Sequence, residues 1–199
     1  MWDQRYSASE FVYGTEPNDF LKSEYSLIPK GGNVLCLAEG EGRNAVFLAK
    51  QGYIVTAVDQ SSVGLEKAEK LARENEVEIS TVAADLANYD LAGKRWDGII
   101  SIFAHVPAEL RKTLHLQAAK SLNKHGVFIL EAYTERHIEL NGVGGPPASK
   151  RELFMSLEEL KLELNGLDFI VGAEVERHIS EGKLHHGNSG VVQIVAKKL

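Results

Sequence analysis

Short apolar runs that alternate with helix-like segments limit this chain to a layered α/β fold. Each of the first five apolar runs leads into a segment with helical spacing or into a long connection. The predicted strands span residues 33–38, 53–59, 78–85, 96–103 and 126–133. The predicted helices span residues 15–28, 43–52, 61–76, 107–122 and 156–166. This alternation is typical of a mainly parallel sheet with helices on both faces.

Two further strand-like runs, residues 168–179 and 190–198, have no helix between them. The connection 180–189 is too short for the crossover that parallel neighbours require, so these two strands should pair antiparallel. The complete prediction is a mainly parallel seven-stranded sheet that ends in an antiparallel C-terminal hairpin.

Two of the predicted helices begin with capping residues. Thr15 is the candidate N-cap of the first helix, and Pro17 suits its first turn. Ser156 precedes the last helix and Glu159 follows three residues later, which is the pattern of a capping box. Local hydrogen bonds should therefore fix where both helices start.

Length and charge argue against several classes of function. The chain has 199 residues, which predicts a single domain spanning residues 1–199. Its net charge of −6 and the lack of any run of Lys or Arg argue against nucleic acid or an anionic membrane as the main partner. The sequence has no apolar stretch of about 18 residues, and its start does not resemble a secretory signal. The single cysteine, Cys36, cannot form an internal disulfide, which favours a cytoplasmic location.

One segment, residues 134–150, has neither strand nor helix spacing. Glycine and proline residues at five of its positions predict a loop. The segment follows the carboxyl end of the fifth predicted strand, and open α/β sheets bind ligands at that edge. It is therefore either a loop near the active site or a mobile surface connection.

A glycine motif joins the first predicted strand to the next helix in VLCLAEGEGRNAVFLAKQGYIVTAVD. Gly40, Gly42 and Ala45 satisfy the G-x-G-x-x-A form. Asp59 ends the following strand, 17 residues beyond Gly42, where a carboxylate accepts hydrogen bonds from a ribose diol. Together these features predict a cofactor that contains adenosine, and the alternative is a tight turn that binds nothing.

Two glutamates in the glycine loop, Glu39 and Glu41, decide between cofactors. A dinucleotide would place its pyrophosphate here, and each carboxylate would repel it by about a kcal/mol or more. S-adenosylmethionine carries a sulfonium and an ammonium instead of a phosphate, so it suits this loop better. The sequence also has no G-x-x-x-x-G-K-[ST] motif and no Y-x-x-x-K pair.

At these motifs the chain resembles the class I S-adenosylmethionine-dependent methyltransferases, over nearly its whole length. Within that class it is similar to the tellurite-resistance and thiopurine methyltransferase-like group. The likeness lies in three parts of the sequence. They are the glycine motif with the helix that begins Arg43-Asn44-Ala45, the opening segments WDQRY and YGTEPNDFL, and the segment LNKHGVFILEAY. The resemblance implies a Rossmann-like class I methyltransferase fold, an N-terminal helical cap at residues 1–30 and a small-molecule acceptor.

The resemblance also implies which residues contact the cofactor. This chain has Cys36 and Ala38 where the group usually has an acidic residue and a first glycine, so Glu39 or Glu41 is expected to bind the methionine ammonium. We favour Glu39 and expect the other carboxylate to face solvent. Asp85 and Leu86 would flank the adenine, although Asp85 also suits a turn. The expected cofactor residues are Glu39, Gly40, Glu41, Gly42, Asn44, Asp59, Gln60, Ser61, Asp85, Leu86 and Phe103.

His105 and His185 are the candidate catalytic residues on the acceptor side. His105 follows the fourth predicted strand, and the GKLHH segment with His185 resembles a G-x-L-H stretch of tellurite-resistance relatives. A histidine in a loop is more often simply a solvated polar residue, and this holds for His137 as well. His185 and His186 are adjacent in an extended chain and point apart, so no metal site is expected.

Trp2, Tyr6 and Tyr13 are the aromatic residues of the N-terminal region. They either cover the cofactor or pack as part of the core. Most of the rate should come from aligning acceptor, methyl group and sulfonium, and the need for a base depends on the acceptor.

The sequence leaves several functions open. The leading one is methyl transfer to a small molecule, such as a soft chalcogen or thiol nucleophile. The others are a non-catalytic S-adenosylmethionine-binding protein and a nicotinamide-dependent oxidoreductase. A methyltransferase that acts on protein or nucleic acid is also compatible with the motifs, but the acidic balance counts against nucleic acid. The identity of the acceptor and the oligomeric state do not follow from the sequence.

Overall fold

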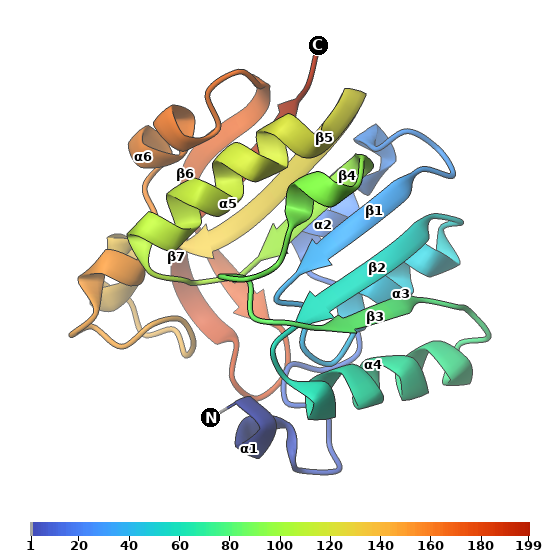
Figure 1. Ribbon diagram of the computed structural model, residues 1–199. Coiled ribbons are helices and arrows are strands. Elements are labelled where there is room, and N and C mark those ends of the chain that lie inside the picture. Colours follow the sequence, from blue (N-terminus) through green and yellow to red (C-terminus); the bar gives the residue numbers. More distant parts are fainter. Residues whose placement is uncertain (1) are drawn as a thin grey trace.

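A seven-stranded sheet forms the centre of the computed structural model, which describes residues 2–199 (Figure 1). The strand order is β3-β2-β1-β4-β5-β7-β6. The strands are β1 (Asn33–Leu37), β2 (Ile54–Asp59), β3 (Ser80–Ala83), β4 (Trp96–Ile102), β5 (Leu122–Tyr133), β6 (Asp168–Ser180) and β7 (His186–Lys197). Met1, which belongs to the predicted cap 1–30, lies outside the described residues. The strand order reverses between β1 and β4, and their carboxyl ends mark the position where open sheets of this kind bind ligands.

The pairing of the strands confirms the predicted sheet. Strands β1 to β5 pair in parallel, whereas β7 pairs antiparallel with both β5 and β6. The hairpin is longer than predicted, because Ser180 still pairs with His186. Its turn therefore contains only residues 181–185.

Helices cover both faces of the sheet (Figure 1). The helices are α1 (Trp2–Tyr6), α2 (Asp19–Glu24), α3 (Arg43–Lys50), α4 (Ser62–Glu74), α5 (Ala108–Ser121) and α6 (Leu157–Glu163). Successive side chains of a strand point to opposite faces. Val127 and Ile129 of β5 accordingly join the core beneath α2 and α3, and Phe128 and Leu130 join the core beneath α5 and α6. Within residues 2–199, no helix combines the length and apolarity needed to cross a membrane.

The first predicted helix, residues 15–28, is shorter than expected. Helix α2 begins after Asn18, whose side chain accepts a hydrogen bond from the Leu21 N–H, and a 3₁₀ turn at Tyr25–Leu27 follows it. Thr15 is exposed and is not the N-cap. Asn18 takes that place because its amide is also held by buried groups far away in the sequence.

The segment 134–150 is not entirely a loop. It contains a 3₁₀ helix at Glu135–Glu139, and Val143 forms an isolated bridge with His186 of β7. One half of the predicted capping box of the last helix is present, because the Ser156 hydroxyl accepts from the Glu159 N–H at 3.3 Å. The Glu159 carboxylate accepts from that hydroxyl at 3.1 Å.

Candidate active site

The loop after β1 turns sharply in a backbone conformation that glycine tolerates best. Ala38, Gly40 and Gly42 have φ values of 49°, 63° and 91°. A Cβ atom on Gly42 would lie 2.5 Å from that of Ala68, so glycine allows the start of α3 to pack directly on α4. The predicted glycine turn is therefore present at the carboxyl end of β1.

Asp59 lies under this loop, at the end of β2. Its two carboxylate oxygens accept hydrogen bonds from the backbone N–H groups of Gly40 at 2.9 Å and Ser61 at 2.8 Å. The Ser61 hydroxyl in turn caps α4 by accepting from the Gly64 N–H. Burial raises the pKa of Asp59, and the backbone hydrogen bonds oppose that shift. Each carboxylate oxygen has a second lone pair, which leaves capacity for a ligand.

Glu39 caps helix α3. Its Oε1 accepts from the backbone N–H groups of Asn44 at 2.9 Å and Ala45 at 2.8 Å, which otherwise have no partner in the first turn. Burial raises the pKa of Glu39 to about 7, against the effect of those hydrogen bonds and of Arg43. The carboxyl group therefore changes charge near neutral pH.

Glu41 anchors the N-terminal segment, which we define as residues 2–16. Its Oε2 accepts from the Val12 N–H at 2.8 Å, and its other oxygen forms an ion pair with Lys67. Lys67 also donates to the carbonyl groups of Ala8 and Glu10. The expectation that the second glutamate faces solvent is wrong, because Glu41 is only 3% exposed under this segment.

Tyr6 of the N-terminal segment lies directly over the glycine loop. A Cβ on Gly40 would lie 2.6 Å from the Tyr6 hydroxyl, and one on Gly64 would lie 3.0 Å from its ring. Asp3 adds a hydrogen bond from the Ser61 hydroxyl. Burial, and next the nearby Asp59 carboxylate, raise the pKa of Tyr6 above its usual value. A ribose that approaches Asp59 over Gly40 would meet Tyr6, so α1 has to shift to admit it.

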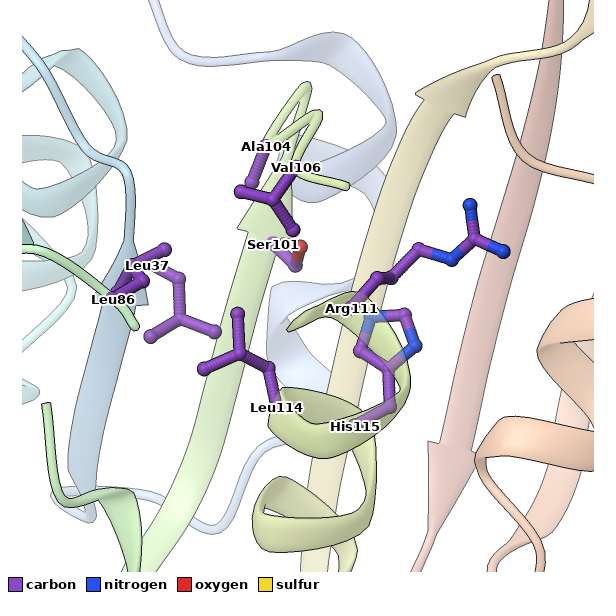
Figure 2. A pocket seen from close by; sticks show the side chains of 8 residues that line it. All are labelled: Leu37, Leu86, Ser101, Ala104, Val106, Arg111, Leu114 and His115. Atoms are coloured by element: carbon purple, nitrogen blue, oxygen red, sulfur yellow. The ribbon is translucent and has the colours of Figure 1, made fainter. Parts of the chain in front are cut away.

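A mostly apolar crevice opens beside the carboxyl ends of β1 and β4 (Figure 2). Leu37 and Leu86 form one side of it, and Leu114 of α5 faces them. The Arg111 guanidinium points away from these leucines, toward Glu163 and the Phe154 carbonyl that it binds. The lining residues are Leu37, Leu86, Ser101, Ala104, Val106, Arg111, Leu114 and His115. The volume of the crevice, about 10 Å³, is room for about one water molecule, so the contact of Leu86 with an adenine stays a prediction.

Three other predicted cofactor residues have mainly local roles. Asp85 is exposed, and its Oδ1 accepts from the Ala87 N–H at 2.9 Å. This contact agrees with the alternative interpretation of Asp85 as a turn residue. Gln60 is also exposed. Asn44 is buried and accepts from the Asn18 N–H at 2.9 Å, which joins α3 to the start of α2.

His105 follows β4 and uses both ring nitrogens on the main chain. Nδ1 lies 2.8 Å from the Leu153 carbonyl, and Nε2 accepts from the Tyr133 N–H at 3.2 Å. Burial lowers the pKa of His105 to about 4, so the ring is neutral at physiological pH. In this conformation neither nitrogen is available to a ligand.

His185 lies in the hairpin turn and is surrounded by aromatic rings. Its ring centroid is 4.4 Å from that of Tyr13 and 4.6 Å from that of Phe103. Burial, with a smaller contribution from Arg43, lowers the pKa of His185 to about 2. His186 is exposed, so the two adjacent histidines do point apart. Among residues 2–199, no three His, Cys, Asp or Glu side chains are grouped to hold a metal ion.

Sequence reasoning missed Tyr133. It ends β5, is fully buried, and stacks on Phe103 with ring centroids 4.7 Å apart. Phe103 itself was expected on the cofactor side, and it packs against both this aromatic group and the core beneath α2 and α3. The available signal was position alone, because Tyr133 is the last residue of a predicted strand at the ligand-binding edge.

Comparisons with known proteins agree with this geometry. Residues 34–126 match the methyltransferase domain family. TehB from Haemophilus influenzae superposes with a TM-score of 0.73 at 19% identity, covering 100% of this chain and 66% of TehB. This chain therefore spans about two thirds of the length of TehB. No curated protein matches the sequence.

Two further solved structures share the fold over most of the chain. One comes from work on the conversion of a disulfide bond into a thioacetal group during echinomycin biosynthesis. It has a TM-score of 0.76 and 16% identity, covering 99% of this chain and 90% of that one. The other is a SAM-dependent methyltransferase from Methanosarcina mazei, with a TM-score of 0.70 and 15% identity, covering 92% and 99%.

The sheet topology, the glycine loop and the family match define one class of protein. The chain has the fold of the class I S-adenosylmethionine-dependent methyltransferases, and its residues 34–126 match the methyltransferase domain family. S-adenosylmethionine is the cofactor of that class. The predicted fold is confirmed, and the predicted resemblance is confirmed over residues 34–126. The match gives no support to the nicotinamide-dependent oxidoreductase.

Proposed function

We propose that this chain transfers the methyl group of S-adenosylmethionine to a small molecule whose nucleophile is a soft chalcogen, such as a thiol sulfur. The observation that carries the proposal is the state of the two histidines on the acceptor side. Both are buried and neutral, with the pKa lowered by burial to about 4 for His105 and about 2 for His185. Such weakly basic groups are poor general bases.

The proposed cofactor site is built around the glycine loop. Asp59 would accept from the ribose hydroxyls, and Leu86 in the crevice would contact the adenine. Glu39 would bind the methionine ammonium with the carboxylate oxygen that α3 does not use. The loop suits this cofactor because glycine brings the main chain close, provided that Tyr6 moves off Gly40.

The acceptor follows from what the site has to do. When bound, S-adenosylmethionine supplies a methyl group on a sulfonium that needs no further activation. A protonated amine would still have to lose a proton before attack, and neither His105 nor His185 is basic enough to take it. A soft chalcogen that carries no proton on the attacking atom, such as a thiolate or a thione sulfur, needs only alignment with the methyl group. The structure from work on echinomycin, whose chemistry is at sulfur, shares this fold and is consistent with such an acceptor.

The cofactor part is tested by calorimetry. S-adenosylmethionine and S-adenosylhomocysteine should bind, and nicotinamide dinucleotides should bind far more weakly. Asp59→Ala should weaken cofactor binding by about 1.5–3 kcal/mol, the scale of a hydrogen bond to a charged group. Asp90→Ala is the matched control, because Asp90 also accepts a backbone N–H but lies in an exposed turn. Tighter binding of a dinucleotide would refute the assignment.

The acceptor part is tested by measuring release of S-adenosylhomocysteine with a panel of thiols, thiopurines, selenite, tellurite and small amines. We expect turnover with a chalcogen acceptor and none with the amines. His185→Ala should keep cofactor binding within about threefold and lower turnover tenfold or more, about 1.4 kcal/mol in the barrier. His105→Ala should also lower turnover, because it releases the Tyr133 main chain. Preferred methylation of amines would overturn the proposal.

A further inference from the structure

Three buried polar atoms gather at the carboxyl end of β5 without a hydrogen-bond partner. They are Tyr133 Oη, His137 Nδ1 and His185 Nδ1, and among residues 2–199 only two other side chains have such an atom. Tyr133, His137 and His185 are 0%, 5% and 9% exposed. Buried polar atoms are nearly always paired in folded proteins, so three together indicate a place built to bind something.

The three side chains converge on Gly144. The ring centroids of Tyr133 and His137 are 4.3 Å apart, and those of Tyr133 and His185 are 5.7 Å apart. A Cβ on Gly144 would lie 2.3 Å from Tyr133 Oη and 2.9 Å from His185 Cδ2. The Gly144 carbonyl accepts from His137 Nε2 at 3.1 Å. The main chain at Gly144 therefore fills the space that these side chains share.

The glycines of this stretch explain how it fits there. Gly144 and Gly145 have φ values of 137° and 73°, and a Cβ on Gly145 would lie 2.8 Å from the Tyr133 ring. A Cβ on Gly142 would lie 2.9 Å from His137 Cε1. Side chains at these positions would keep the segment 142–145 away from the cluster. Its β-sheet pairing is limited to the bridge between Val143 and His186.

We infer that Tyr133, His137 and His185 form the binding site of the methyl acceptor, and that the segment 142–145 is the lid that lifts off to admit it. The inference rests on the proposed function, because the acceptor must reach the methyl group at this edge of the sheet. Tyr13 links the site to the proposed cofactor position, because its ring centroid lies 4.4 Å from that of His185 and 6.3 Å from that of Tyr6, which covers Gly40.

The chemistry of the cluster selects the acceptor. Once the segment 142–145 has lifted, His137 no longer donates to the Gly144 carbonyl, and its neutral ring offers one N–H donor and one lone pair to a ligand. Tyr133 Oη is free to donate. Arg43, a buried cation whose charge acts on His185, is paired with Glu181 at 2.6 Å. The site therefore suits an uncharged planar molecule with a hydrogen-bond donor next to an acceptor, held between aromatic rings, rather than an oxyanion.

The test uses 2-mercaptopyridine, whose thione form has both groups, and selenite as the anionic comparison. Calorimetry with the full chain, with and without S-adenosylhomocysteine, should show binding of 2-mercaptopyridine and weaker binding of selenite. Tyr133→Phe removes only the unpartnered hydroxyl. It should weaken 2-mercaptopyridine binding tenfold or more, leave the cofactor Kd within about twofold, and leave the melting temperature equal or higher. Tyr25→Phe is the control, because its hydroxyl bonds to Gln51 far from this site.

Each outcome decides the matter. No binding of 2-mercaptopyridine to the parent chain, preferred binding of selenite, or equal binding by Tyr133→Phe would overturn the inference. A chain that binds the probe but not S-adenosylmethionine would refute the proposed function and leave the cluster as a binding site. The lid is tested separately by amide exchange at Val143, whose N–H bonds to the His186 carbonyl. Its protection should change when the probe binds, and an unchanged value would refute the lid.

Discussion

At the residue scale, Glu39 and Glu41 show how one loop gives two carboxylates different tasks. Gly40 lies between them with a φ of 63°, and the chain turns there. The Glu39 carboxylate points to the first turn of α3. The Glu41 carboxylate points to the other side of the loop, toward the Val12 N–H and Lys67. Burial raises the pKa of Glu39 to about 7, which makes its charge sensitive to pH in the neutral range.

Cofactor affinity should therefore rise with pH through the pKa of Glu39. Between pH 5.5 and 7.5 the cofactor ammonium stays mostly charged, since an α-amino group has a pKa near 7.7–8.0, while Glu39 goes from mostly protonated to mostly ionised. An ionised carboxylate binds the ammonium better, so the Kd should fall about tenfold or more over this range. Calorimetry at several pH values measures the change. Glu39→Gln should remove the pH dependence, and a variant that keeps it would show that another group is responsible.

The same shift has a consequence for stability with a definite sign. The folded-state pKa of Glu39 is above its usual 4.5, so the stabilisation linked to its proton is complete below pH 4.5 and is lost as pH rises through about 7. Between pH 5 and 8, urea unfolding should therefore show that the free energy of unfolding of Glu39→Gln increases relative to that of the parent chain. The gain is bounded by about 3 kcal/mol, since one pKa unit is about 1.4 kcal/mol.

At the scale of elements, the N-terminal segment closes the cofactor loop. Helix α1 places Tyr6 over Gly40, and Lys67 holds the stretch after it through the carbonyl groups of Ala8 and Glu10. In the proposed site the ribose would need the space that Tyr6 fills over Gly40, so release of this segment should precede cofactor binding. The Lys67 contacts then act against binding.

Lys67→Met should therefore speed the association of S-adenosylmethionine, by about threefold or more. Trp2 stacks on Tyr6 within α1, so stopped-flow tryptophan fluorescence follows the segment directly. Lys70→Met is the control, because Lys70 makes only an exposed pair with Glu74 on the same helix. If the segment exchanges amide protons faster in Lys67→Met but the association rate is unchanged, its opening does not limit binding.

The elements also show what local sequence determines. Strands and most helices follow from apolar spacing, and the Ser156 cap follows from a pattern of four residues. The start of α2 does not, because the side chain of Asn18 is held in place by hydrogen bonds to Glu131 and Glu181, which lie far along the chain. The role of Tyr133 does not follow from local sequence either, because it depends on the main chain at Gly144 and Gly145 packing against the Tyr133 side chain.

At the scale of the whole molecule, one buried charge cluster joins the two ends of the chain. Glu131 of β5 is fully buried and receives two hydrogen bonds from Arg177 of β6, at 2.8 Å and 2.6 Å. Glu181 pairs with Arg177 at 2.9 Å and with Arg43 of α3 at 2.6 Å. Asn18 donates to both glutamates. A glutamate inside an apolar strand is visible in the sequence, but its partners depend on the final sheet order, which brings β6 to the edge and α3 beside the hairpin turn.

Removing the central cation of this cluster should destabilise the entire fold. Arg177→Met leaves the fully buried Glu131 without its charged partner, and breaking a buried pair in this way costs about 3–5 kcal/mol. Urea unfolding measures the loss. Arg151→Met is the control, because the Arg151–Glu135 pair at 2.8 Å is exposed and such pairs contribute less than about 1 kcal/mol. Adding Glu131→Gln to Arg177→Met removes the unpaired charge and should restore part of the loss. Equal losses of unfolding free energy in Arg177→Met and Arg151→Met would mean that Asn18 and Gln193, which also donate to Glu131, compensate its charge. The cluster would then not be what joins the ends of the chain.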